Sequence, residues 1–231
     1  MVCVSDVMPS RSADEVRREF LRLSDRINAV KRVWNHQVEV LAVTKGFAPD
    51  VVELAIEAGC TAIGENYAQE LLTRVPILDR LGDRRPTVHF IGHLQTNKVR
   101  RLARVVDVWA TVGSASLAEE IAKRAPAARV LIQLNTTGES QKSGCNPKHA
   151  VSLIERCVEF GLVVEGVLAM GPTSGNEQAT RMAFEVARQI ADDHGLAVCS
   201  LGMSGDLELA VAAGSTQVRV GTALFGPRPP R

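Results

Sequence analysis

Strand-like segments alternate with helix-like segments along all 231 residues, and this alternation predicts a (β/α)8 TIM-type barrel with an extra N-terminal helix. Strict alternation implies right-handed crossovers and a parallel sheet. Eight strands in a chain of this length favour a closed barrel over an open doubly wound sheet, because no G-x-G-x-x-G follows the first strand. We therefore expect residues 1–231 to form a single domain.

The N-terminal region carries a strong helix signal. Ser12-Ala13-Asp14-Glu15 has the S-x-x-E form of a capping box. Behind it, apolar residues from Val16 to Trp34 recur at steps of three and four, as in an amphipathic helix. We expect a flexible segment over residues 1–12 and a helix over 13–35 that flanks the core.

The remaining elements follow as strands and helices in turn. Short apolar runs predict strands near 38–44, 60–64, 87–91, 106–112, 128–134, 162–169, 196–201 and 216–221. Patterns between them predict helices near 49–58, 66–80, 96–104, 115–124, 147–160, 176–193 and 205–213. The carboxyl ends of the strands then meet at one face, where barrels carry their functional residues.

Composition argues against several kinds of partner and environment. The 27 Lys and Arg residues against 26 Asp and Glu leave a net charge of +1, which gives no reason to expect nucleic acid. No apolar run is long enough to cross a bilayer, and residues 1–12 lack a signal-peptide core. The five cysteines are spread out without C-x-x-C or zinc-type spacing, so we expect reduced thiols and a cytoplasmic protein.

Lys45 stands at the end of the first predicted strand. Side chains alternate along a strand, so Lys45 shares a face with Leu41 and Val43. A charge on that face is costly unless an anion meets it or the amine is neutral, and a partly desolvated amine suits Schiff-base chemistry. The spacing alone favours a lysine that reaches solvent past the strand end, and the rest of the chain reverses that preference.

Two small-residue loops follow the last two predicted strands. Ser200-Leu201-Gly202-Met203-Ser204-Gly205-Asp206 opens a helix with Ser204 as the expected N-cap, and Gly221 with Thr222 follows the final strand. In barrels these two loops commonly form a phosphate site, because N–H groups at a helix start bind anions. Either loop alone fits a simple capped helix better than a phosphate site, so only their joint placement supports the prediction.

Arg219 and two histidines also lie near predicted strand ends. Arg219 shares a face with Gly221 and needs a partner, because a guanidinium cannot lose its charge; a carboxylate elsewhere in the fold is the structural alternative. His89 and His93 have no third ligand nearby in the sequence. We therefore expect hydrogen-bonded histidines and no metal.

Seven short motifs occur in order along the chain: Ala42-Val43-Thr44-Lys45, Gly64-Glu65-Asn66-Tyr67, His89-Phe90-Ile91-Gly92, Leu94-Gln95-Thr96-Asn97-Lys98, Lys142-Ser143-Gly144, Gly202-Met203-Ser204 and, most specifically, Val218-Arg219-Val220-Gly221-Thr222-Ala223-Leu224-Phe225-Gly226. Together they resemble the pyridoxal phosphate homeostasis family over nearly the whole chain after the N-terminal helix. Three positions depart from the family pattern: Thr44 replaces a common serine, Leu201 a common methionine and Gly205 a common acidic residue. None removes the lysine or the two loops.

The resemblance implies a barrel like the N-terminal domain of alanine racemase, with pyridoxal 5′-phosphate held as a Schiff base on Lys45. It implies an intracellular carrier and buffer in vitamin B6 homeostasis, without catalytic residues, that hands the cofactor to apo forms of pyridoxal-phosphate-dependent enzymes. It leaves the assembly as a monomer or a weak dimer. The other implied cofactor contacts are Ser200, the backbone of Met203 and Ser204, Gly221 and Thr222 at the phosphate, Arg219 at the pyridine nitrogen, and Asn66 near the ring.

Two other functions compete with the carrier. An amino acid racemase on the same cofactor would take a tyrosine from a second β domain, whereas this chain ends five residues after Gly226 and has one tyrosine, Tyr67. An arginine at the ring nitrogen would also weaken the cofactor as an electron sink. A cofactor-free barrel that binds a phosphorylated metabolite would use Lys45 as a plain cation, and visible absorbance would distinguish it.

Overall fold

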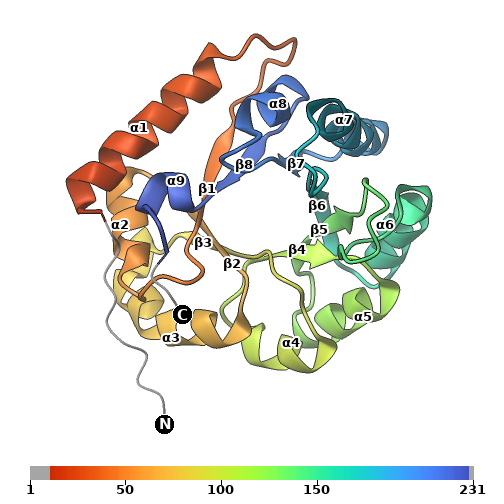
Figure 1. The fold of residues 1–231 in the computed structure, drawn as a ribbon. Helices are drawn as coiled ribbons and strands as arrows, with labels where there is room; N and C mark the ends of the chain where they lie inside the picture. Colours follow the sequence, from red (N-terminus) through yellow and green to blue (C-terminus); the bar gives the residue numbers. More distant parts are fainter. Residues whose placement is uncertain (1–10, 229–231) are drawn as a thin grey trace.

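The structure is a computed structural model in which residues 11–228 are described. Across these residues eight parallel strands close into one barrel in chain order, with β8 paired back to β1 (Figure 1). This confirms the predicted (β/α)8 fold, and each strand lies within two residues of its predicted bounds. The strands are β1 (Glu39–Val43), β2 (Ala62–Glu65), β3 (Thr87–Phe90), β4 (Val108–Val112), β5 (Arg129–Leu134), β6 (Val163–Ala169), β7 (Val198–Leu201) and β8 (Gln217–Val220).

Helices surround the barrel on its outer side (Figure 1). The predicted pattern reproduces all of them except the short α9, which holds too few residues to show a helical period. Among the described helices none is both long and apolar enough to span a bilayer. They are α1 (Ala13–Ala29), α2 (Val51–Ala58), α3 (Ala68–Leu81), α4 (Thr96–Leu102), α5 (Ala115–Arg124), α6 (Ala150–Glu159), α7 (Glu177–Asp193), α8 (Leu207–Ala212) and α9 (Thr222–Phe225).

Helix α1 is shorter than the predicted 13–35. It begins with the expected capping box between Ser12 and Glu15 but ends at Ala29, where Val30 turns into extended backbone. Trp34, the last apolar residue of the predicted helical pattern, lies in a loop instead. Its ring packs beside the guanidinium of Arg188, which lies 5.6 Å from the ring centre. A tertiary contact thus replaces the last predicted turns. Most of the segment expected to be flexible, residues 1–10, lies outside the described residues.

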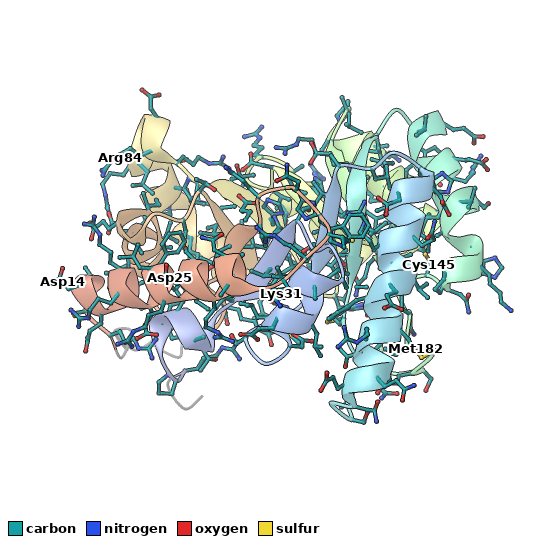
Figure 2. All side chains as sticks on the ribbon, turned by 90° about the horizontal axis from the view of Figure 1, so that it is seen from above. Asp14, Asp25, Lys31, Arg84, Cys145 and Met182 are labelled. Carbon is teal, nitrogen blue, oxygen red and sulfur yellow. The ribbon has the colours of Figure 1, made fainter. Side chains whose placement is uncertain are left out.

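The extra helix α1 lies against α2, α8 and α9, on the outside of the barrel near β1 (Figure 1). Its apolar face is buried through Val16, Leu23 and Ile27. Its polar side chains, Asp14 and Asp25 among them, are exposed (Figure 2). Helix α1 therefore acts as the predicted flank of the core.

The core has two parts because strand side chains alternate between two faces. Val40, Ala42 and many other residues fill the space between strands and helices. Val108, Ala110, Leu131 and Leu168 form a separate cluster inside the barrel. Inward-facing residues near the carboxyl ends of the strands therefore line the barrel mouth.

Candidate functional site

A cavity of about 280 Å³ opens at the carboxyl end of the barrel. Its wall combines residues from the ends of β1, β2, β3, β6, β7 and β8 and from the segments that follow them, so distant parts of the sequence meet there. Val43 and Ile91 form part of the apolar lining. Seven of the eight predicted site residues lie in the wall: Lys45, Asn66, Met203, Ser204, Arg219, Gly221 and Thr222.

Lys45 is half-buried in a turn that follows β1. Arg74, only 1% exposed, donates from its Nη2 to the carbonyls of Thr44 (2.7 Å) and Phe47 (3.1 Å) on either side of the lysine. The carboxylate of Glu70 accepts the N–H of Gly46 at 2.7 Å. Helix α3, which carries both Arg74 and Glu70, therefore holds the lysine turn from outside the cavity.

Glu65, at the end of β2, completes this buried support. Its Oε1 lies 2.8 Å from Arg74 Nε and accepts the hydroxyl of Thr44, while its Oε2 has no hydrogen-bond partner among the described residues. Burial raises the pKa of Glu65 to about 7 and outweighs the opposite effects of Arg74 and of the Thr44 hydrogen bond. Sequence reasoning missed this role of Arg74. The available signal was an arginine spaced with Leu71 and Leu78 on the apolar face of a helix.

The loop after β7 differs from its predicted form. Helix α8 begins at Leu207 with Asp206 at its N-cap, so the expected N-cap role of Ser204 is wrong. The Asp206 carboxylate instead accepts the N–H of Met203 at 2.6 Å and closes a turn, which makes that N–H unavailable to a ligand. The N–H groups of Ser204 and Gly205, also in the cavity wall, have no protein acceptor within the described chain.

Gly202 makes this tight loop possible. Its φ of +78° lies in the left-handed region, and a Cβ built there would fall 2.3 Å from the Cβ of Ala210. Only glycine fits between the end of β7 and helix α8. The glycine therefore lets the loop turn back toward the cavity.

Ser200 is fully buried and does not reach the cavity wall. Its hydroxyl donates to Gln217 (2.9 Å) and accepts from Arg219 Nη1 (2.9 Å). Arg219 also donates to the carbonyls of Ser200 (2.7 Å) and Ala169 (2.9 Å), which serve in place of the carboxylate considered as its structural partner. Burial lowers the pKa of Arg219 to about 10, with nearby Asp206 acting in the opposite direction, so the side chain stays charged at neutral pH.

The two histidines lie in different surroundings. His89 is buried inside the barrel, burial lowers its pKa to about 4, and its Nδ1 has no hydrogen-bond partner among the described residues. His93 Nδ1 lies 3.0 Å from the hydroxyl of Ser143. Within residues 11–228 no group of three His, Cys, Asp or Glu side chains could hold a metal.

Arg228 is a wall residue that the sequence gave no reason to select, because it follows Gly226 and Pro227 in irregular chain. Its side chain lies across two glycines: a Cβ on Gly46 would meet its Cδ at 3.1 Å, and one on Gly221 its Nη2 at 3.5 Å. With Lys45 and Arg219 it gives the cavity three basic side chains. No carboxylate appears among the described lining residues.

The donor set fits an anionic ligand that also offers a hydrogen-bond donor. Three basic side chains and the N–H groups of Ser204 and Gly205 suit a phosphate. The Oδ1 of Asn66 is buried without a hydrogen-bond partner in the described chain, so it can accept one from the ligand. The lysine amine and the phosphate-type site share one cavity, as pyridoxal 5′-phosphate requires.

Comparison with known proteins agrees with this geometry. The family model described as the alanine racemase N-terminal domain matches residues 21–229. A pyridoxal phosphate homeostasis protein from Pseudomonas aeruginosa is 36% identical over 198 residues, which cover 83% of this chain and 85% of that protein.

Solved structures give the same result. The crystal structure of an unknown protein from Bifidobacterium adolescentis superposes with a TM-score of 0.85 at 33% identity, covering 96% of this chain and 98% of that one. The structure of PipY from Synechococcus elongatus with pyridoxal phosphate bound has a TM-score of 0.73 at 27% identity, covering 88% of this chain and 100% of that one. The chain belongs to the alanine racemase N-terminal domain family and, within it, to the pyridoxal phosphate homeostasis proteins.

Proposed function

We propose that this protein binds pyridoxal 5′-phosphate covalently through Lys45 and acts as a carrier and buffer in intracellular pyridoxal phosphate homeostasis. The observation that carries the proposal is one cavity that joins a half-buried lysine to two arginines and to unpaired backbone N–H groups, with no lining carboxylate in the described chain. The homeostasis protein of Pseudomonas aeruginosa and the pyridoxal-phosphate-bound PipY support it.

When bound, the cofactor supplies an aldehyde that condenses reversibly with an amine. Lys45 would hold the cofactor through its Nζ, which would bond to the aldehyde carbon as the aldehyde oxygen leaves with the two amine hydrogens as water. The turn that Arg74 and Glu70 hold keeps this amine at the cavity wall. Asn66 Oδ1 accepts a hydrogen bond from the ligand.

The remaining wall residues divide between the phosphate and the ring. The N–H groups of Ser204 and Gly205, the Gly221 backbone and the Thr222 hydroxyl bind the phosphate, and Arg228 neutralises part of its charge. Arg219 would face the pyridine nitrogen. Ser200 then acts through its hydrogen bond to Arg219 and does not touch the phosphate.

The lining also favours a carrier over a racemase. A two-base racemase needs a second proton acceptor opposite the lysine, and the titratable side chains in the described lining are Lys45, Arg219 and Arg228. Tyr67 lines a different cavity. A permanently protonated Arg219 at the ring nitrogen keeps that nitrogen unprotonated, which weakens the ring as an electron sink.

The binding test combines colour with peptide mapping. Purified protein is mixed with pyridoxal 5′-phosphate, its visible spectrum is taken, and the complex is reduced with borohydride and mapped by mass spectrometry. We expect a yellow protein with the adduct on Lys45, no adduct at that position in Lys45→Ala, and an unchanged result in the exposed control Lys148→Ala. A colourless protein, or an adduct retained in Lys45→Ala, would contradict the site.

A second test separates carrier from enzyme. The loaded protein is incubated with L-alanine in D2O, and loss of the α-proton signal is followed by NMR. We expect exchange no faster than with free cofactor at the same concentration. Exchange with turnover that depends on Lys45 would show a racemase-type enzyme.

We place this function in the cytoplasm, with apo enzymes as recipients and the protein as a monomer or weak dimer. Free thiols at Cys60, Cys145, Cys157 and Cys199 suit a reducing compartment. Mixing the loaded protein with an apo aminotransferase should restore aminotransferase activity. Failure to do so under conditions where free cofactor succeeds would contradict the carrier role.

A further inference from the structure

A second cavity lies directly beside the first. It too has a volume of about 280 Å³, and Asn66 lines both. Its apolar part includes the buried Phe90 and the ring of Tyr67, which is 41% exposed. An aromatic face next to a buried apolar floor suits a planar ring.

The outer wall of this cavity is basic. Lys98 and Arg101, one helical turn apart on α4, both line it. Neither forms an ion pair within the described chain. Helix α4 also carries Arg100 and no acidic residue, so the local potential attracts an anion.

The wall between the two cavities is closely packed. Gly92 lies so close to Asn66 that a Cβ on it would fall 2.0 Å from the Asn66 carbonyl oxygen. His93 at the rim is tied to the Ser143 hydroxyl at 3.0 Å, which anchors it to the loop after β5. The second cavity is therefore a formed site, separated from the cofactor cavity by one residue.

We propose that this second cavity binds a phosphorylated planar ring of about the cofactor's size without a covalent bond. The cavity volume of about 280 Å³ is compatible with that size, the exposed ring of Tyr67 supports a planar ring, and Lys98 with Arg101 supports the phosphate. The inference rests on the proposed function and deepens it, since it gives a phosphorylated pyridine a place next to Lys45 before or after covalent binding.

The test uses protein whose Lys45 has been blocked with pyridoxal 5′-phosphate and borohydride. Pyridoxine 5′-phosphate, which has the ring and phosphate but no aldehyde, is titrated in by calorimetry. We expect one equivalent to bind, and pyridoxine and inorganic phosphate each to bind at least about tenfold more weakly. Equal affinity for inorganic phosphate would overturn the assignment of a ring compound.

A matched pair of double variants locates the site. Lys98→Gln/Arg101→Gln removes two charges from the lining, whereas Arg100→Gln/Arg104→Gln removes two from the same region outside the lining. We expect binding to weaken by about tenfold or more in the first and by less than about threefold in the second. No binding to the blocked protein, or equal losses in both variants, would overturn the proposal.

Failure of the proposed function would be visible separately. If borohydride leaves no adduct on Lys45, the covalent site is wrong. The same titration on untreated protein then compares the two double variants. A loss of pyridoxine 5′-phosphate affinity confined to Lys98→Gln/Arg101→Gln still supports the second site. Equal affinity of the two double variants for this ligand refutes it.

Discussion

Replacing Arg74 with methionine should destabilise the protein strongly and in a way that depends on pH. The guanidinium is 1% exposed, pairs with Glu65 at 2.8 Å and donates to the carbonyls of Thr44 and Phe47. Methionine fills similar volume but leaves the Glu65 carboxylate buried without its cation. Removing one partner of a buried ion pair costs about 3–5 kcal/mol.

Protonation of Glu65 sets the pH dependence. Its folded pKa of about 7 lies above the ordinary value of 4.5 because of burial, so its contribution to stability is full below 4.5 and is lost as pH rises through 7. Arg74 opposes that rise, so its removal moves the folded pKa of Glu65 higher. The free energy of unfolding lost in Arg74→Met should therefore be about 3–5 kcal/mol at about pH 8 and clearly smaller at about pH 5.

Urea unfolding at both pH values measures this for the wild type, Arg74→Met, Glu65→Gln and the double variant. The double variant should recover at least about 1 kcal/mol relative to the sum of the single changes, because no unpaired charge remains. Arg80→Met is the control, because Arg80 lies on the same helix α3, pairs at the surface with Glu53 of α2, and its loss should cost less than about 1 kcal/mol. A pH-independent loss with additive single variants would refute the reasoning.

Three further predictions concern other buried groups. Arg219→Met removes the hydrogen bonds to the carbonyls of Ser200 and Ala169 and should cost about 1–3 kcal/mol in urea unfolding, so an unchanged midpoint would contradict these bonds. His89 has a folded pKa of about 4, so its contribution to the free energy of unfolding is full above pH 6.5 and is lost as pH falls toward 4. His89→Gln should therefore reduce the fall of the melting temperature between pH 6.5 and 4. An unchanged fall would contradict the burial of His89 as its cause. Gly202→Ala should lower the melting temperature well below that of Gly205→Ala, where a Cβ meets nothing within 4 Å, and equal melting temperatures would show that the loop relaxes freely.

The barrel and most of the cavity could be predicted because they follow from local patterns and one geometric rule. Apolar runs locate the strands, and parallel strands bring their carboxyl ends to one face. Lys45, Asn66, Arg219 and Thr222 each follow or end a strand, so their meeting in one cavity is a consequence of the topology. Their roles toward the cofactor stay predictions until binding is measured.

The remaining features depend on contacts that no local pattern encodes. Helix α1 ends earlier than predicted because Trp34 packs beside Arg188. Arg228 reaches the cavity wall because the irregular chain that carries it passes Gly46. Ser200 sits on the strand that leads into the predicted phosphate loop, yet its hydroxyl is taken by Gln217 and Arg219. Proximity in sequence to a loop therefore does not decide whether a side chain reaches the cavity.

The support of Lys45 bears on what a carrier needs. Glu65, Glu70 and Arg74 hold the lysine turn, and none of them is in the described lining of the cavity. A carrier must release its cofactor and take up another without losing the position of its lysine. Because the turn is fixed from the helix side of the barrel, the position of Lys45 does not depend on a phosphate across the cavity. The buried ion pair between Glu65 and Arg74 is costly to desolvate. It maintains the orientation of Lys45, which is a physical reason for its presence in the core.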